Sequence, residues 1–367
     1  MPSNYGTNLA QAFASKALEI FYETSVADDI TNRDYEGEIK GRATIVNVLE
    51  FAAQDWQTYT GATITPTAVQ EIKGQLATNQ QLDYYFQVLD ITRLQSWIKN
   101  PEGTIIEQLG KRLKERVDAY ILSQYTDVAS GNRIGTNYTT GTVAVATGTG
   151  VVTGSGTTFT AAMVGRGFKA AGHSVWYTVS AYTSATSITI VNDTQDDVAS
   201  GTYTGGTIGG GATYVLEAAT PVALSASNVD SYVIKMRSAL KKAKVWDHGT
   251  PWLVVSTDVY SMMLQSTIAF TPYTPSSFEN VIQKAIVGMY RGFKVYESQQ
   301  VQGDNTNGYH CLGGINAWKT MAEALVEAEE EPFLAGNFGR GYKGLFVYGQ
   351  KTLDERRKCA TELFATA

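Results

Sequence analysis

The chain has 367 residues, of which 43% are hydrophobic, so it is long enough to bury a sizeable core in two or three domains. Its formal net charge is −6, and no run of lysine and arginine forms a basic stripe, which argues against specific nucleic-acid recognition. A weak, local contact with a phosphate backbone is still open. Charged residues make up only 17% of the chain and glycine is frequent, a composition that favours β structure and turns.

The two cysteines, Cys311 and Cys359, form no CxxC motif, which indicates synthesis in a reducing compartment rather than a disulfide scaffold. The first residues, MPSNYGTNLAQAF, lack the basic and apolar regions of a signal peptide, so we expect none. No stretch approaches 18 apolar residues, and we therefore expect no membrane span.

Residues 1–40 are predicted to form an N-terminal arm with one short helix, which ends in a dense segment of both charge signs. A solvated loop is the simple interpretation of this segment. The alternative is an arm whose charges pair with a neighbouring subunit, and the candidate contacts are then Arg33, Asp34, Glu36, Glu38 and Lys40. Exposed pairs of this kind contribute only about 0.2–1 kcal/mol each, so a subunit could leave a wrong position before an assembly locks.

Residues 41–77 are predicted to form an extended β-hairpin, because a β-branched run (TIVNVLEF) is followed by a return segment, TGATITPTAVQEIKG. Trp56 and Tyr59 fall near its tip, where one chain offers little to bury them. Local packing and docking on a partner both fit these two aromatic residues, and we keep them as candidate inter-subunit contacts.

Residues 78–135 contain a mixed strand and helix segment and then a long helix. Asn100 is a good N-cap and Pro101 suits the first helical position. Apolar residues then recur every three or four positions, which predicts a helix of about 28 residues that acts as a structural spine. Its expected stripe is Ile106, Leu109, Leu113, Val117 and Tyr120.

Composition changes sharply in residues 136–217. Between Gly141 and Tyr214, 74 residues include 14 glycines and 16 threonines but only five charged side chains. Short apolar alternations separated by turn residues predict a small inserted all-β domain, a sandwich or a barrel. We expect that removing residues 141–214 leaves assembly intact.

Residues 218–367 mix helices and strands. Ser227 is the expected cap of a helix, PWLVVST is predicted to be a buried strand, and Thr257 or Asp258 is expected to cap the next helix. A further helix is predicted over 278–287, followed by a strand-rich segment, GMYRGFKVYESQQV, and a mostly β tail over 310–363.

The sequence offers no constellation typical of catalysis or metal binding. His173, His248 and His310 have no ligand spacing, and Ser155 in TGSGTTF lacks the G-x-S-x-G pattern. We interpret TIGGGATY as a flexible exit from the inserted domain, GRGYKG near Arg340 as a β-turn, and EAEEE (327–331) as a solvated acidic loop. We therefore expect no enzyme activity, no metal and no cofactor.

The order of these elements resembles the major capsid protein of tailed bacteriophages, with the fold named after phage Hong Kong 97. The segments that carry the resemblance are TNRDYEGEIKGRATIVNV, NPEGTIIEQLGKRLKERVDAYIL, GTPWLVVSTDVYSMML and GMYRGFKVYESQQV. The implied fold is α+β, with an N-arm, an extended hairpin loop, a peripheral domain with a spine helix and an axial domain. The inserted β domain departs from the minimal plan.

The resemblance implies a protein that self-assembles into pentamers and hexamers around double-stranded DNA. It also implies a separate scaffolding protein, a portal, possibly a decoration protein, non-specific contact with packaged DNA, assembly in the host bacterial cytoplasm and a final place in the virion. Three alternatives stay open: an encapsulin-like compartment, a carbohydrate-binding or adhesive surface protein that acts through residues 141–214, and a hydrolase that uses Ser155.

Overall fold

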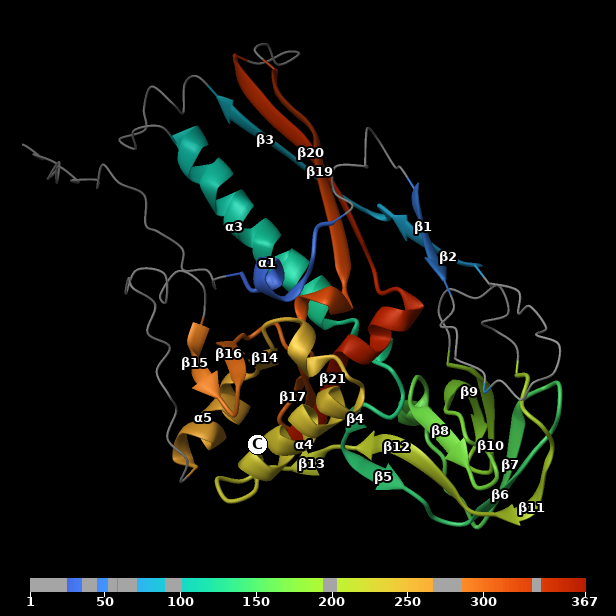
Figure 1. Cartoon of the computed structure of the whole chain (residues 1–367). Helices are drawn as coiled ribbons and strands as arrows, with labels where there is room; N and C mark the ends of the chain where they lie inside the picture. Colours follow the sequence, from blue (N-terminus) through green and yellow to red (C-terminus); the bar gives the residue numbers. More distant parts are fainter. Residues whose placement is uncertain are drawn as a thin grey trace, which may run out of the picture.

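The computed structural model describes residues 25–34, 45–51, 58, 71–89, 101–193, 203–266, 286–331 and 338–367. Three sheets and a separate hairpin organise these residues (Figure 1). A long helix and a three-stranded sheet project from a body that contains the two larger sheets.

The projecting part is built from the helix α3 (Pro101–Leu122) and a sheet in the order β19-β20-β3. Its strands are β3 (Gln80–Leu89), β19 (Thr320–Glu331) and β20 (Gly339–Lys351), and both neighbours of β20 run antiparallel to it. Exposure alternates strictly along β3, as expected for a strand with one covered and one solvated face. The covered face meets α3, where the rings of Tyr120 and Tyr348 pack edge to face at 5.5 Å.

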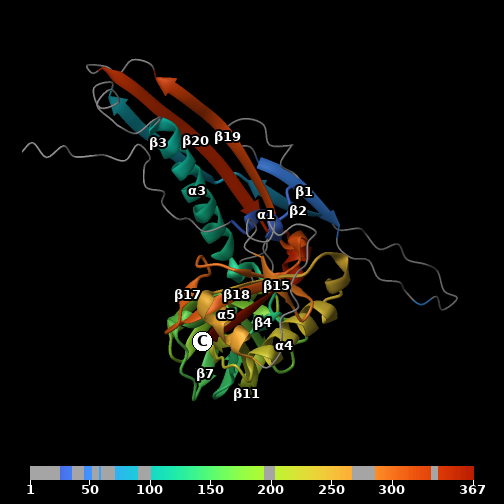
Figure 2. The same cartoon turned by 90° about the vertical axis from the view of Figure 1, so that its left-hand side faces the viewer.

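The hairpin pairs β1 (Ile45–Phe51) with β2 (Glu71–Ala77) in antiparallel register, from Ile45 opposite Ala77 to Phe51 opposite Glu71. This confirms the two strands at the base of the predicted hairpin. Figure 2 shows it beside the long sheet. Val48 and Leu76 are buried there against Ala322 and Leu353 in a cluster of only four residues.

The body contains a mixed sheet whose main path has six strands, in the order β13-β21-β18-β14-β16-β15. Its strands are β13 (Val222–Ala223), β14 (Trp252–Val255), β15 (Ile286–Tyr290), β16 (Phe293–Glu297), β18 (Gly308–Gly314) and β21 (Ala360–Thr366), with β4 (Arg133–Ile134) and β17 (Gly303–Asp304) paired alongside. The helices α4 (Val229–Lys242) and α5 (Thr257–Gln265) share a hydrophobic core with this sheet. The predicted buried strand PWLVVST is confirmed as β14, whose four residues are all buried.

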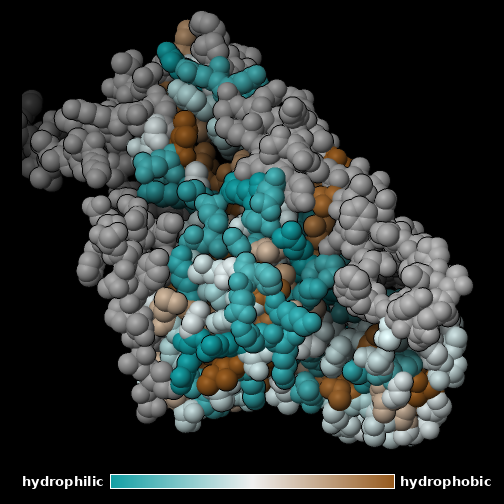
Figure 3. Space-filling view, in the orientation of Figure 1, coloured by the Kyte–Doolittle hydropathy of each residue, from teal (hydrophilic) through white to brown (hydrophobic). Residues whose placement is uncertain are grey.

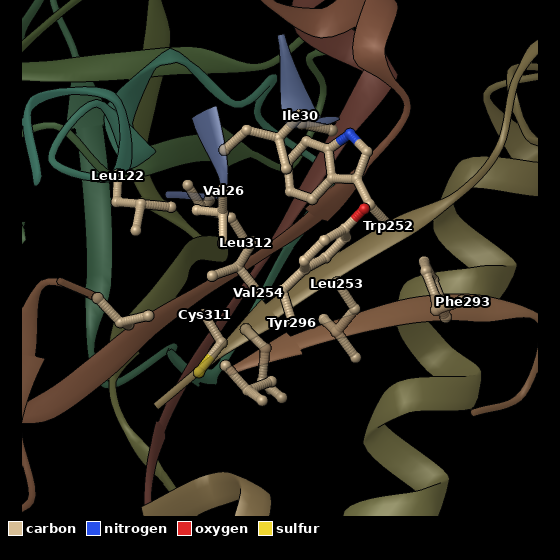
Figure 4. Packing of buried hydrophobic residues seen from close by; sticks show 14 of the residues in the cluster. Val26, Ile30, Leu122, Trp252, Leu253, Val254, Phe293, Tyr296, Cys311 and Leu312 are labelled. Carbon is tan, nitrogen blue, oxygen red and sulfur yellow. The ribbon is translucent and has the colours of Figure 1, made fainter. Parts of the chain in front are cut away.

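One core joins the body to the arm and to α3. Val26 and Ile30, which flank and end the short helix α1 (Ala27–Ile30), pack with Leu122 of α3 near Trp252 and Leu312 (Figure 4). Because all of these side chains are buried, the point where the arm leaves the body is fixed by hydrophobic packing.

Residues 136–220 form an eight-stranded sheet in the order β11-β6-β7-β10-β9-β8-β12-β5. Its strands are β5 (Thr136–Tyr138), β6 (Thr142–Val145), β7 (Val151–Ser155), β8 (Gly167–Ala170), β9 (Tyr177–Ser184), β10 (Ser187–Asn192), β11 (Ile208–Ala212) and β12 (Tyr214–Thr220). It has a hydrophobic core of its own, with Phe168, Ile188 and Leu216 at its centre. Its surface is pale in Figure 3, because threonine and glycine are neither strongly polar nor strongly apolar.

Several local predictions are wrong. Helix α3 has 22 residues rather than about 28, because the chain leaves the helix at Leu122 and Tyr125–Asp127 form a separate 3-10 turn. Asn228 rather than Ser227 is the N-cap of α4, and Ser256 rather than Thr257 or Asp258 caps α5 by accepting the Val259 N–H bond.

Other corrections replace loops by strands. Residues 327–331 belong to β19, Arg340 lies in β20, and TIGGGATY contains the edge strand β11. In each case the segment is a strand because it pairs with a strand from elsewhere in the chain, and a short stretch of sequence does not contain that partner. Most of the helix predicted over 278–287 lies outside the described residues, and its last two residues belong to β15.

Two glycine substitutions test the corner where the hairpin meets the sheet. A Cβ on Gly349 would lie 2.1 Å from the carbonyl oxygen of Ala77, so Gly349→Ala should lower the free energy of unfolding by about 2 kcal/mol or more. Gly110, inside α3, has no heavy atom within 4 Å of such a Cβ, and Gly110→Ala should raise stability by about 0.5–1 kcal/mol. Urea unfolding of the unassembled chain measures both, and equal effects of the two substitutions would contradict this account.

Candidate assembly surfaces and their buried ionic junction

Asp118 anchors the end of the N-terminal arm. Its buried carboxylate accepts hydrogen bonds from the backbone N–H groups of Val26 and Ala27, each at 3.0 Å, and from Ser25 Oγ at 2.8 Å. These N–H groups open α1, where a helix has no internal acceptors, and a negative charge there is favourable. A side chain from the second-to-last turn of α3 therefore caps a helix more than 90 residues earlier in the chain.

The two-signed segment lies only partly within the described residues. Arg33 forms an ion pair with Asp28 of the same chain at 2.6 Å, and Asp34 is exposed. Glu36, Glu38 and Lys40 lie outside the described residues, as do Trp56 and Tyr59 of the hairpin. The structure therefore gives Arg33 a partner inside its own chain and leaves the intermolecular role of all seven residues as a prediction.

The backbone beside Arg33 touches the long sheet at one point. Asn32 forms a single parallel bridge to Thr320, with the Asn32 N–H donating to the Lys319 carbonyl and the Met321 N–H donating to the Asn32 carbonyl, each at 2.9 Å. Lys319 itself is fully buried, and its ammonium group binds the Asp127 carboxylate at 2.7 Å. This pair holds the base of β19, where the arm arrives.

The solvated face of the long sheet carries mixed charges and apolar side chains. Glu329 pairs with Lys343 at 2.9 Å, and on the other face Glu330 pairs with Arg340 at 2.6 Å. Tyr85 is 51% exposed on the solvated face. At the far end of the sheet, Phe338 is 83% exposed, and Leu89 beside it is 40% exposed.

A buried ionic junction joins the eight-stranded sheet to the body. Glu362 of β21 has no solvent exposure, and its Oε1 lies 2.8 Å from Arg166 Nη1 and 2.6 Å from His310 Nδ1. Arg166 comes from the eight-stranded sheet, directly before β8, whereas Glu362 and His310 come from the body. The imidazole of His310 is stacked between the rings of Tyr125 and Phe364 at 3.7 and 4.4 Å.

In two further contacts across the junction, the acid comes from the eight-stranded sheet and its partners come from the body. Asp193, which follows β10, forms an ion pair with Arg357 of the body, with 2.8 Å between Oδ1 and Nη2. Glu217 of β12 accepts backbone hydrogen bonds from Gly131 at 2.8 Å and from Arg133 at 3.0 Å. Three guanidinium groups, of Arg133, Arg166 and Arg357, thus face three carboxyl groups across one buried boundary.

Burial and charge act in opposite directions on the acids of this junction. Burial alone would raise the pKa of Glu362, but Arg166, the His310 hydrogen bond and Arg133 outweigh it and lower the pKa to about 2. At Glu217 burial prevails over the backbone N–H groups and Arg133, and the pKa is raised to about 7. Burial lowers the pKa of the Arg133 guanidinium, whose N–H groups donate to the carbonyls of Thr126 and Val128.

The junction bears on the expectation that removing residues 141–214 leaves assembly intact, which stays a prediction. Their removal takes away Arg166 and Asp193, which leaves Glu362 and Arg357 buried without these opposite charges. An uncompensated buried charge costs several kcal/mol. The eight-stranded sheet therefore supplies charges that neutralise buried charges of the body.

Within the described residues, no group of three or more His, Cys, Asp and Glu side chains is arranged to hold a metal ion. Ser155 ends the strand β7 and is exposed, and the three predicted histidines lie in separate surroundings. Among the described helices, none is long and apolar enough to cross a membrane.

No protein-family model and no curated protein matches the chain by sequence. Solved structures do match over nearly its whole length. A structure of Mycobacterium phage Che8 superposes with a TM-score of 0.59 at 14% identity, covering 98% of this chain and 97% of that one. The capsid structure of cyanophage P-SCSP1u gives 0.55 at 12% identity, covering 100% and 97%, and the capsid of Ralstonia phage GP4 gives 0.51 at 10%, covering 100% and 98%.

This chain has the capsid fold of tailed bacteriophages. The fold expected from the order of the sequence elements, α+β of the Hong Kong 97 type, is thereby confirmed in outline. At 10–14% identity the likeness lies in the path of the chain, since few side chains are shared.

Two buried acids that join distant segments of the chain escape sequence reasoning. Asp118 sits in KRLKERVDAY, where it resembles one more surface charge, although its position one residue after Val117 places it beside the apolar stripe. Glu362 is the only acid in the apolar run CATELFATA, and an isolated charge in such a run is a signal of a buried, paired group.

Replacing Asp118 tests the anchor of the capsid fold's arm. Asp118→Ala leaves two buried N–H groups without an acceptor and should lower the free energy of unfolding by about 1–3 kcal/mol. Asp34→Ala, at an exposed position, should change it by less than about 0.5 kcal/mol. Urea unfolding compares the two, and a shift no larger for Asp118→Ala than for Asp34→Ala would show that Asp118 does not anchor α1.

Replacing Arg166 tests the junction. Arg166→Met should lower the free energy of unfolding by about 3–5 kcal/mol, because Glu362 loses its nearest guanidinium while still buried. Combining it with Glu362→Gln should restore part of the loss, as a double-mutant cycle would measure. The matched control is Lys169→Met, since Lys169 lies over the Trp176 ring at 5.7 Å and is not among the partners of Glu362. An additive double mutant would mean that the two residues do not interact.

The pH dependence of unfolding tests Glu217. Its folded pKa of about 7 exceeds the ordinary 4.5, so its contribution to stability is complete below pH 4.5 and is lost as pH rises through 7. The difference of 2.5 units corresponds to about 3 kcal/mol. Glu362 acts oppositely, and its contribution is lost as pH falls from 4.5 toward 2. Unfolding between pH 4.5 and 8 should show a decline in the native chain that is absent in Glu217→Gln; the same decline in both would assign it elsewhere.

Proposed function

We propose that this protein is a major capsid protein, whose copies form pentamers and hexamers that close an icosahedral shell around phage double-stranded DNA. The observation that carries the proposal is the likeness to solved capsids over almost the full length of both chains. A shell subunit acts through its shape and its contacts with other copies, so the proposal assigns it no catalytic residues.

The distribution of buried surface within the chain supports this function. The body and the eight-stranded sheet each have a substantial core, whereas Val48 and Leu76 of the hairpin lie in a small separate cluster with Ala322 and Leu353. Two-stranded hairpins are marginally stable alone. A two-stranded hairpin of this kind fits a protein in which neighbouring copies complete the packing.

We also propose the division of the chain expected from the sequence: an arm (1–40), an extended loop (41–77), a peripheral domain (78–135), an inserted β domain (136–217) and an axial domain with return strands (218–367). Support for the insertion comes from the close approach of its two ends. A Cβ on Gly135 would lie 2.8 Å from the Cα of Ala218, so the chain leaves and rejoins the body at one place.

The same proposal covers the partners. We infer a separate scaffolding protein, a portal, possibly a decoration protein and non-specific contact with packaged DNA, with the finished subunit in the virion. Arg33, Asp34, Glu36, Glu38, Lys40, Trp56 and Tyr59 are the proposed inter-subunit contacts. Of these, Lys40 gives the cleanest test, because changing Arg33 also breaks its own-chain pair with Asp28.

Sedimentation of the purified chain, followed by negative-stain microscopy of the fast fraction, tests the function. We expect rings or closed shells, alone or after addition of a phage scaffolding protein, and DNA inside particles made during infection. A chain that stays monomeric under every condition would contradict the proposal. Shells that enclose protein cargo in place of DNA would favour an encapsulin-like compartment.

The Lys40→Glu variant tests the charged arm within the same assay. We expect at least about a tenfold lower yield of shells, with the unfolding midpoint of the unassembled chain unchanged, because several weak exposed pairs add up over a closed shell. Lys114→Glu, on the exposed surface of α3, makes the same charge change elsewhere and is the control. Equal yields from the two variants would remove the arm charges from the contact.

A further inference from the structure

The exposed side of helix α4 concentrates positive charge in a chain whose formal net charge is −6. Between Ser231 and Trp246 the sequence has five cationic side chains and no acid. All five are exposed, and they are Lys235, Arg237, Lys241, Lys242 and Lys244. The opposite side of the helix is apolar and buried, so the cations lie on the side that faces away from the core.

The acids next to α4 neutralise little of this charge. Lys241 binds the Asp247 carboxylate at 2.5 Å. Asp230, in the first turn of the helix, binds Arg291 at 2.5 Å. Among the described residues, no carboxylate lies within ion-pair distance of the other four cations. Four positive charges on this surface are therefore not neutralised by the part of the chain that the structure describes.

Two of these four cations lie over aromatic rings. The guanidinium of Arg237 is 5.0 Å from the centre of the Trp246 ring, and the ammonium group of Lys235 is 4.1 Å from the centre of the Tyr232 ring. A cation–π contact orients a side chain but leaves its charge in place. The two cations are thus held at the surface of the helix with their charge still directed outward.

The dipole of α4 explains only part of the charge pattern. Cations in the last turn of a helix are favourable, and Lys241 and Lys242 lie there. Lys235 and Arg237 lie more than one turn before the end, where the dipole has little effect. Their presence on the same side as the last-turn lysines therefore calls for another explanation, and an external anion supplies one.

The charged stretch of α3 differs from that of α4 in its acids. Its sequence, KRLKER, includes Glu115, and Lys111 pairs with Glu107 at 3.2 Å. Arg112 and Lys114 are exposed there, so α3 presents the same kinds of cation on a surface of mixed charge. The acid-free surface of α4 is the more favourable of the two for a polyanion.

We propose that the basic face of α4, made of Lys235, Arg237, Lys242 and Lys244, contacts the phosphate backbone of packaged double-stranded DNA. The inference rests on the proposed function, since packaging brings the DNA to the subunit. DNA carries one negative charge per about 1.7 Å of its axis, so it can supply a phosphate to each cation without a fixed register. Three of the four cations are lysines, which bind phosphate as point charges and read no sequence.

The number of cations makes the contact weak and sensitive to salt. Four phosphate contacts give a slope of about −3.6 in a plot of log affinity against log salt, which is about a 100-fold loss of affinity between 50 and 200 mM. The rest of the chain is negative overall and repels DNA. Each subunit would thus neutralise a short length of the nearest DNA and would release it readily.

Titration of a DNA duplex with the unassembled chain tests the basic face. The probe is a fluorescent duplex of about 30 base pairs and mixed sequence, and its anisotropy is followed between 50 and 200 mM salt. The affinity of the native chain should fall about 100-fold over this range. The variant Lys242→Gln/Lys244→Gln keeps about two contacts, so its affinity should start lower and fall only about 10-fold.

The matched control is Arg112→Gln/Lys114→Gln, which removes two exposed cations from α3 and should keep the native salt dependence. Equal losses in the two double variants would show that DNA responds to total charge, and would overturn the inference. Absence of binding by the native chain at 50 mM salt would do the same. Poly-glutamate binding that depends on Lys242 and Lys244, with duplex binding that does not, would assign the surface to an acidic protein and also overturn it.

Cross-linking of DNA-filled particles tests the same contact inside the shell. Formaldehyde joins lysine amines to bases, and a protease that cleaves before aspartate then releases one peptide, Asp230–Trp246, because no aspartate lies between these positions and Asp247. We expect nucleotide adducts on this peptide. Adducts exclusively on other peptides would overturn the inference and leave the capsid function intact. Particles without DNA would contradict the proposed function, and the duplex titration would still decide on the basic face.

Discussion

The structure depends on one buried carboxylate. Glu362 lies in a central strand of the body, between β18 and β4, and its charge is tolerable only because Arg166 and His310 converge on one of its oxygen atoms. Arg166 belongs to a different sheet, about 200 residues earlier in the chain. The strand order of the body and the position of the eight-stranded sheet are therefore specified by the same ion pair.

This arrangement makes the boundary between the eight-stranded sheet and the body an ionic one. A module that only decorates a surface would share a small, polar boundary with the body and could be removed. Here each side supplies both a cation and an anion. Arg166 of the eight-stranded sheet pairs with Glu362 of the body, and Arg357 of the body pairs with Asp193 of the sheet. Because breaking either pair leaves a buried charge without its partner, the two sheets are expected to keep one relative position.

The sequence predicts the secondary-structure elements of the molecule better than the contacts between distant segments. Order, hydrophobic period and composition suffice for α3, for the buried strand at Trp252 and for the all-β character of residues 136–220, because these depend on local spacing. Asp118, Glu362 and the strand identity of 327–331 depend on partners from distant segments, such as the 92 positions between Asp118 and Val26. No window of a single sequence contains both halves of such a contact.

The same division separates what is stable within one chain from what is left for other chains. Glu362, Asp118 and Lys319 are each buried and paired, and together they fix the body, the start of α1 and the base of β19. Beyond these three anchors, the long sheet carries exposed ion pairs such as Glu329 with Lys343 and Glu330 with Arg340. Under the proposed function, strong pairs in the interior would keep each subunit in one shape, and weak exposed pairs would let contacts between subunits form and break until the geometry is correct. A chain with weak pairs inside would change shape at each contact, and one with strong pairs on its surface would stay bound in a wrong position. Closure of a shell from identical copies therefore requires strong buried pairs within the subunit and weak exposed pairs between subunits.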